Sequence, residues 1–235
     1  MAKVVVSPHL DDAVLSVYGQ LGAETTVITV LAGLPPEGSL SDWDRQSGAN
    51  DSRARMAERR EEDRRALERS AAVPVHLDFP DRQYVALGMP KPSPADVAEA
   101  LRPYLEGAGE VLAPSALSTN SRNVLRHWRR RRGSDHRLIR DAALQVRPDA
   151  TLYAELPYAL SKDRGFTLPR DACRPPRRQR EHRLPPEQLA DKIASVRCYS
   201  TQLDPLVAIF GDFLAGDRLG REVLWDAPAV VARRR

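Results

Sequence analysis

A histidine and two adjacent carboxylates stand close together near the N-terminus, within the run Ser-Pro-His-Leu-Asp-Asp at residues 7–12. Imidazole nitrogen and carboxylate oxygen are good zinc ligands, and a further carboxylate beside them can act on a bound water. His9, Asp11 and Asp12 are therefore candidates for metal chemistry. Aspartate is also a common helix-capping residue, so a purely structural role for Asp11 or Asp12 stays open at this point.

A second pair, Asp135-His136, stands directly before an apolar helical pattern. A helix there would pack on the same sheet as the first run, so its histidine can reach the same edge. Catalytic zinc typically takes three protein ligands and leaves one position for water. His9, Asp12 and His136 would supply those three. The remaining histidines have milder interpretations: His76 as a strand residue, His182 in a loop rich in arginine and proline, and His127 either on the surface or in the site.

The elements that must position these residues alternate along the chain. Short apolar runs predict strands at residues 4–6, 25–31, 73–77, 110–113 and 151–155. Helical periodicity predicts helices at 13–21, 51–69, 94–105 and 136–144. This alternation predicts a Rossmann-like, three-layer α/β/α fold with a mostly parallel sheet. The run at 7–12 then lies at the carboxyl edge of the sheet, where ligands bind.

Two stretches lack a clear period. Residues 32–50 are rich in Gly, Pro and Ser and are predicted to form a loop; loops of this length are often functional. After Tyr158 the pattern weakens, and one helix is predicted at about 186–202. We expect one domain over residues 1–235, with the part from about 160 forming irregular loops and a helix packed on it. Loops at 32–50 and 162–186 would line the pocket.

Composition narrows the possible partners. No run of about 18 apolar residues occurs, so no membrane span is expected. The N-terminus lacks the pattern of a signal peptide, which favours a cytoplasmic protein. The net charge is +4, and four arginines at 129–132 form a basic run, but 36 basic residues are balanced by 32 acidic ones. Nucleic-acid binding is therefore not expected. The oligomeric state stays open, a homo-oligomer included.

Residues 8–13, Pro-His-Leu-Asp-Asp-Ala, resemble the Pro-His-Pro-Asp-Asp-Glu signature of the LmbE-like, or PIG-L, zinc de-N-acetylase family. Residues 133–136, Gly-Ser-Asp-His, resemble its later His-Pro-Asp-His element, and residues 59–62 resemble its Arg-x-x-Glu helix. The likeness covers most of the chain. It implies that His9, Asp12 and His136 bind Zn²⁺ and that Asp11 is the general base. It also implies that Arg59 and Asp81 bind the substrate. A salt bridge on a charged helix is the alternative for Arg59.

The resemblance implies hydrolysis of an N-acetyl or other N-acyl group on an amino sugar or a sugar-bearing small metabolite. The variant His-Leu-Asp-Asp-Ala-Val is similar to that of members in natural-product pathways, including glycopeptide sugar deacetylases. Two departures stand out: Ala13 replaces the signature glutamate, and Gly133 replaces a histidine that helps to polarise the carbonyl. His127, Tyr158 or an arginine would have to substitute for it. The alternatives are a zinc amidase acting on another amide, such as a thiol conjugate, and a catalytically silent metal- or carbohydrate-binding relative.

Overall fold

A computed structural model describes residues 2–116, 135–161, 165–166 and 178–226. His127, Gly133 and the arginine run at 129–132 lie outside these ranges. The main sheet has the strand order β3-β2-β1-β4-β5-β9-β8, and its first five strands are parallel. Its members are β1 (Lys3–Ser7), β2 (Thr25–Thr29), β3 (Val73–His76), β4 (Glu110–Pro114), β5 (Thr151–Tyr153), β8 (Gln179–Arg183) and β9 (Arg221–Trp225).

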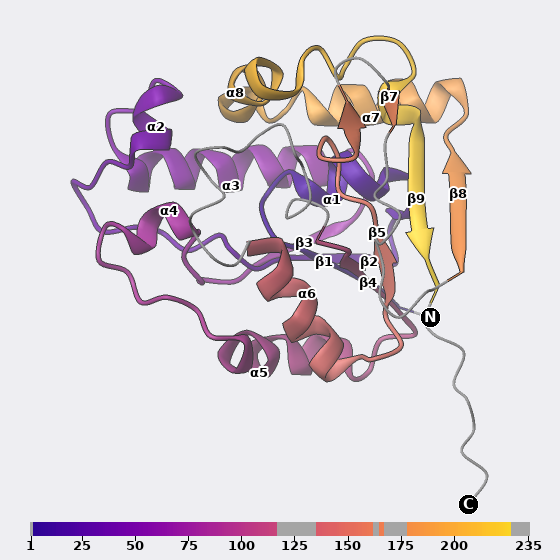
Figure 1. Ribbon diagram of the computed structural model, residues 1–235, viewed down its shortest axis with the longest axis horizontal. Helices are drawn as coiled ribbons and strands as arrows, with labels where there is room; N and C mark the ends of the chain where they lie inside the picture. Colours follow the sequence, from indigo (N-terminus) through magenta and orange to yellow (C-terminus); the bar gives the residue numbers. More distant parts are fainter. Residues whose placement is uncertain (1, 117–134, 162–164, 167–177, 227–235) are drawn as a thin grey trace, which may run out of the picture.

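Helices cover both faces of this sheet, which confirms the predicted three-layer fold (Figure 1). One face carries α1 (Asp12–Val17), α3 (Ser52–Glu68), α7 (Pro186–Val196) and, beyond them, α8 (Ser200–Phe210). The other face carries α5 (Pro94–Leu105) and α6 (Asp135–Val146), which pack side by side. Smaller elements complete the described ranges: α2 (Asp42–Gln46), α4 (Arg82–Val85), the 3-10 turns η1 (Tyr18–Gln20) and η4 (Arg218–Gly220), and the ribbon of β6 (Leu160–Ser161) and β7 (Gly165–Phe166).

The central strands follow from their apolar runs. Val4, Val5 and Val6 of β1 are all buried, as expected for a parallel strand covered by helices on both faces. From the α5 and α6 side, Leu101 and Ile139 pack into the same core and are fully buried. In the part of the chain that the structure describes, no helix has the length and apolar character needed to cross a bilayer.

Residues 178–226 are more regular than their sequence predicts. β9 pairs antiparallel with both β5 and β8 and so extends the sheet. β8 has no apolar pattern because it is a mostly exposed edge strand of charged residues, and His182 lies in this strand instead of in a loop. The predicted loop at 32–50 likewise contains the short helix α2.

The single helix predicted at 186–202 is wrong, because the chain breaks between α7 and α8. Two carboxylates of α3 stabilise the break. Glu62 accepts the backbone N–H of Thr201 at 2.8 Å and so satisfies the N-terminus of α8. Asp63 accepts the Tyr199 hydroxyl at 2.8 Å. These bonds compensate for the helical hydrogen bonds lost at the break.

A buried ion pair connects α7 to β9. Lys192 Nζ lies 2.8 Å from Glu222 Oε1, and both side chains are fully buried. Glu222 also accepts the N–H of Gly19 at 3.1 Å, beside the end of α1. Burial lowers the pKa of Lys192, so the pair depends on close contact to remain charged.

We predict that Lys192→Met lowers the free energy of unfolding by about 3–5 kcal/mol, because the Glu222 carboxylate would stay buried without its cation. Urea unfolding followed by circular dichroism measures the change. Arg102→Met, which breaks exposed ion pairs on α5, is the control and should leave the midpoint nearly unchanged. Equal midpoints for the two variants would contradict the prediction.

Candidate metal centre

The candidate site lies where the strand order of the sheet reverses. β2 lies on one side of β1 and β4 on the other, so the loops after β1 and β4 diverge and leave a crevice at the carboxyl edge. The loop after β1 is organised by the buried Ser7. Its hydroxyl donates to the His9 carbonyl at 2.7 Å and accepts the Ala13 N–H at 3.2 Å. This pair of bonds places His9, Asp11 and Asp12 at the start of α1.

The structure brings His9, Asp12 and His136 together. Asp12 Oδ2 lies 3.2 Å from His9 Nδ1 and 3.6 Å from His136 Nε2. Donor atoms of the three residues all lie within 4.8 Å of one another, and the two imidazole rings have centroids 5.1 Å apart. A tetrahedral zinc ion with bonds of about 2.0–2.1 Å holds its ligand atoms about 3.3 Å apart. The observed spacing fits such an ion.

His136 is oriented by a carboxylate behind it. Its Nδ1 lies 3.2 Å from Glu155 Oε1, and both side chains are buried. Its Nε2 is buried and has no hydrogen-bond partner among the described residues. Glu155 is held by the Ser115 hydroxyl at 2.7 Å and by the N–H of Ala116 at 2.6 Å. A metal-binding histidine usually contacts a carboxylate through one ring nitrogen and binds the metal through the other. The arrangement of His136 and Glu155 therefore fits a metal ion.

The two adjacent aspartates have opposite electrostatic environments. Burial, reinforced by the charge of Asp12, raises the pKa of Asp11 to about 7. Burial would also raise the pKa of Asp12, but His136 and His9 outweigh it and lower that pKa below its usual value. Asp11 makes no side-chain capping bond to α1, so the capping interpretation of Asp11 is wrong. One carboxylate is thus suited to hold a cation and the other to exchange a proton near neutral pH.

Two further carboxylates face the outer side of His9. Its Nε2 lies 3.7 Å from Asp135 Oδ2 and 3.9 Å from Asp81 Oδ2. Asp81 therefore lies at the rim of the metal group, where a bound molecule would approach. No separate role was predicted for Asp135 from the sequence. Its position next to His136 in the chain was the one feature that indicated its place near the site.

Arg59 is buried and faces a different partner. Its Nη1 lies 3.0 Å from Asp44 Oδ1, and the Tyr84 hydroxyl donates to Asp44 Oδ2 at 3.0 Å. Arg59 Nε and Nη2 have no hydrogen-bond partner among the described residues. The observed ion pair resembles the salt-bridge alternative, except that Asp44 comes from α2 instead of from the same helix.

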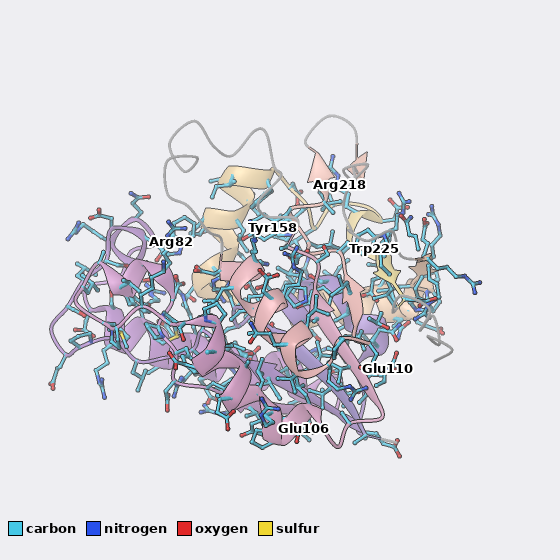
Figure 2. The ribbon with its side chains drawn as sticks, turned by 60° about the horizontal axis from the view of Figure 1, so that its bottom comes forward. Arg82, Glu106, Glu110, Tyr158, Arg218 and Trp225 are labelled. Atoms are coloured by element: carbon cyan, nitrogen blue, oxygen red, sulfur yellow. The ribbon has the colours of Figure 1, made fainter. Side chains whose placement is uncertain are left out.

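Tyr158, labelled in Figure 2, contacts one residue of α6 and one of α8. Its ring meets that of His136 edge-on with centroids 5.1 Å apart, and Phe210 holds it from the other side at 5.3 Å. Burial, together with Asp12 and Asp11, raises the pKa of Tyr158 well above its usual value, so its hydroxyl stays protonated and able to donate.

Solved structures of deacetylases share this fold over almost the whole chain. The zinc-inhibited form of teicoplanin deacetylase Orf2 has a TM-score of 0.74 at 24% identity, with 96% of this chain and 97% of that chain covered. A deacetylase–bog complex from the teicoplanin pathway has a TM-score of 0.72 at 25% identity and the same coverage. The A40926 pseudoaglycone deacetylase Dbv21 has a TM-score of 0.67 at 25% identity, with 96% of each chain covered.

No protein-family profile and no curated protein sequence matches this chain. The structural neighbours nevertheless confirm the resemblance to the LmbE-like, PIG-L deacetylases that the first motif predicts. The fold and the family likeness are thus established by structure where sequence comparison alone finds no match.

Glu155 provides a direct test of the metal group. We predict that Glu155→Gln weakens metal affinity about 10- to 100-fold, because the amide cannot orient and polarise His136 as the carboxylate does. Competition with a fluorescent zinc chelator measures the affinity. Glu99→Gln, on the exposed face of α5, is the matched control and should bind metal as the unaltered protein does. Unchanged affinity in Glu155→Gln would exclude this role.

Proposed function

We propose that this chain, which has the fold of the LmbE-like deacetylases, is a zinc-dependent hydrolase that removes an N-acetyl or other N-acyl group from an amino sugar. The observation that carries the proposal is the group of His9, Asp12 and His136 with Asp11 directly beside it. Two neighbours at 25% identity are deacetylases named for teicoplanin and A40926 pseudoaglycone. They favour a sugar-bearing natural product as the substrate.

The residues divide the chemistry among them. His9, Asp12 and His136 would hold the zinc ion, which when bound acts as a Lewis acid and lowers the pKa of water to about 7. A carboxylate oxygen of Asp11 takes the proton of the attacking water and passes it to the departing amine. Asp11 suits both transfers, because it is a buried carboxylate directly beside the metal group and the same group must first accept and then donate the proton.

Two side chains are proposed to position the substrate. Asp81, at the rim, accepts a hydrogen bond from a sugar hydroxyl. The Tyr158 hydroxyl donates to the carbonyl oxygen as it gains negative charge, which compensates for the histidine that Gly133 replaces. Arg59 supports this arrangement indirectly, because its ion pair with Asp44 holds α2 in place.

Substitutions separate metal binding from proton transfer. We expect His136→Ala to lose the metal, whereas Asp11→Asn keeps it and loses about 10²- to 10⁴-fold in turnover. Metal analysis of each purified variant, combined with mass-spectrometric detection of the free amine from a panel of N-acyl glucosamines, gives both readouts. His182→Ala, in the edge strand β8, is the control and should keep both properties.

The same panel decides between the candidate functions. Full deacylase activity in metal-free protein would overturn the proposal. Stoichiometric zinc without hydrolysis of any N-acyl sugar would indicate a silent relative. Turnover of a thiol-conjugate amide alone would indicate a different zinc amidase.

Tyr158 gives an independent prediction. Tyr158→Phe should lower kcat about 10²- to 10³-fold with little change in KM or zinc content, because only the hydrogen bond to the developing oxyanion is removed. Steady-state kinetics on N-acetylglucosamine measure the effect. Tyr104→Phe, on the surface of α5, serves as the control. A kcat equal to that of the control would mean that a group other than Tyr158 donates the hydrogen bond to the carbonyl oxygen.

A further inference from the structure

Asp81 is connected to the 32–50 segment through one glutamine. Gln83 uses its backbone N–H to donate to Asp81 Oδ1 at 3.1 Å, and its side-chain Nε2 donates to Asp81 Oδ2 at 2.9 Å. Its side-chain oxygen accepts the Ser41 hydroxyl at 2.7 Å. Ser41 is buried and begins α2, which lies at the same end of the molecule as α4 (Figure 1).

The direction of each bond in this chain follows from the donors that are available. Ser41 Oγ accepts the N–H of Asp44 at 3.1 Å, so its single proton is free to go to Gln83. Because the Asp81 carboxylate only accepts hydrogen bonds, Gln83 must present its NH₂ group to Asp81, which leaves its oxygen for Ser41. The reversed amide would place an oxygen against the Asp81 carboxylate, which accepts hydrogen bonds only. The network therefore permits one orientation of the glutamine.

This arrangement leaves Asp81 as a fixed acceptor. Each of its two oxygens receives one hydrogen bond from Gln83, and Oδ2 also faces His9 Nε2 at 3.9 Å. The lone pairs that remain can only accept. A substrate group that hydrogen-bonds there must be the donor, such as a hydroxyl or an ammonium group, within a few ångströms of the metal group; His9, Asp81 and Asp135 also lie close enough together to hold a cation.

We propose that Gln83 is a positioning residue that sets Asp81 for a hydroxyl donor of the substrate and transmits to it the conformation of the 32–50 segment through Ser41. The inference rests on the proposed function, since it concerns how that site recognises its sugar. It also defines the substrate class further: the sugar must carry a free hydroxyl near the scissile amide, and a sugar blocked there would be a poor substrate.

The test compares variants of Gln83 and Ser41 in N-acetylglucosamine hydrolysis. Gln83→Ala should raise KM about 10- to 100-fold, the effect of losing a hydrogen bond to a charged group, while kcat and zinc content stay within about twofold. Gln83→Glu should raise KM at least as far, because it places a second carboxylate beside Asp81. Ser41→Ala removes the hydroxyl that Gln83 accepts and should raise KM, whereas Ser41→Thr keeps that hydroxyl and should raise KM less. Glu99→Gln, on the exposed face of α5, is the control and should leave KM unchanged.

A double-variant cycle excludes a merely structural effect. In an Asp81→Asn background, Gln83→Ala should cause little further rise in KM, because the group that it positions has been changed already. Independent, multiplicative effects of the two substitutions would overturn the inference, as would an unchanged KM in Gln83→Ala.

Failure of the proposed function is recognised separately. If the unaltered enzyme, loaded with zinc, does not hydrolyse N-acetylglucosamine, binding of glucosamine to the same variants is measured by calorimetry. Weaker binding by Gln83→Ala and Gln83→Glu, but not by the control Glu99→Gln, supports the inference. Equal binding by all variants, or no binding by the unaltered enzyme, overturns it.

Discussion

The site depends on the contacts that the Asp12 carboxylate makes with His9 and His136. A nearly buried charge must be compensated, and Asp12 Oδ2 is met by the N–H of His9 at 2.9 Å and by imidazole nitrogens of His9 and His136. These two histidines are far apart in the chain. Their convergence on one oxygen defines a position where a divalent cation would replace the weaker contacts.

The sheet makes that convergence possible. Because β1 is central and pairs with both β2 and β4, residues that follow β1 and β4 reach the same crevice. The Tyr153 hydroxyl donates to the Val6 carbonyl at 2.9 Å, which ties β5 to β1 across β4. Ser16 of α1 accepts the Leu156 N–H at 3.0 Å and so anchors the turn that carries Glu155. Through Glu155, the orientation of His136 thus depends on buried residues of the sheet and of α1.

Much of this could be predicted from local pattern. Short apolar runs, of which Val4–Val6 is the clearest, predicted the central strands, and the position of His9 after the first strand placed it at the ligand-binding edge. The edge strand β8 was missed because its exposed charged residues carry no apolar signal. Glu155 was predicted as the last residue of a strand, whereas β5 ends at Tyr153, and nothing in the sequence paired Glu155 with His136. The break before α8 depends on Glu62, more than a hundred residues earlier.

The same limit applies to substrate recognition, where distant polar residues determine one another's orientation. Ser41 and Gln83 lie 42 positions apart, and neither has a motif that indicates a role. Their importance follows only from counting donors and acceptors: the Asp81 carboxylate leaves the Gln83 amide one orientation, and in that orientation the amide oxygen accepts the Ser41 hydroxyl. Candidate metal ligands in this fold can therefore be recognised from a short motif, because they lie where a strand ends or a helix begins. Specificity resides in a network whose members are ordinary residues until their hydrogen bonds are assigned.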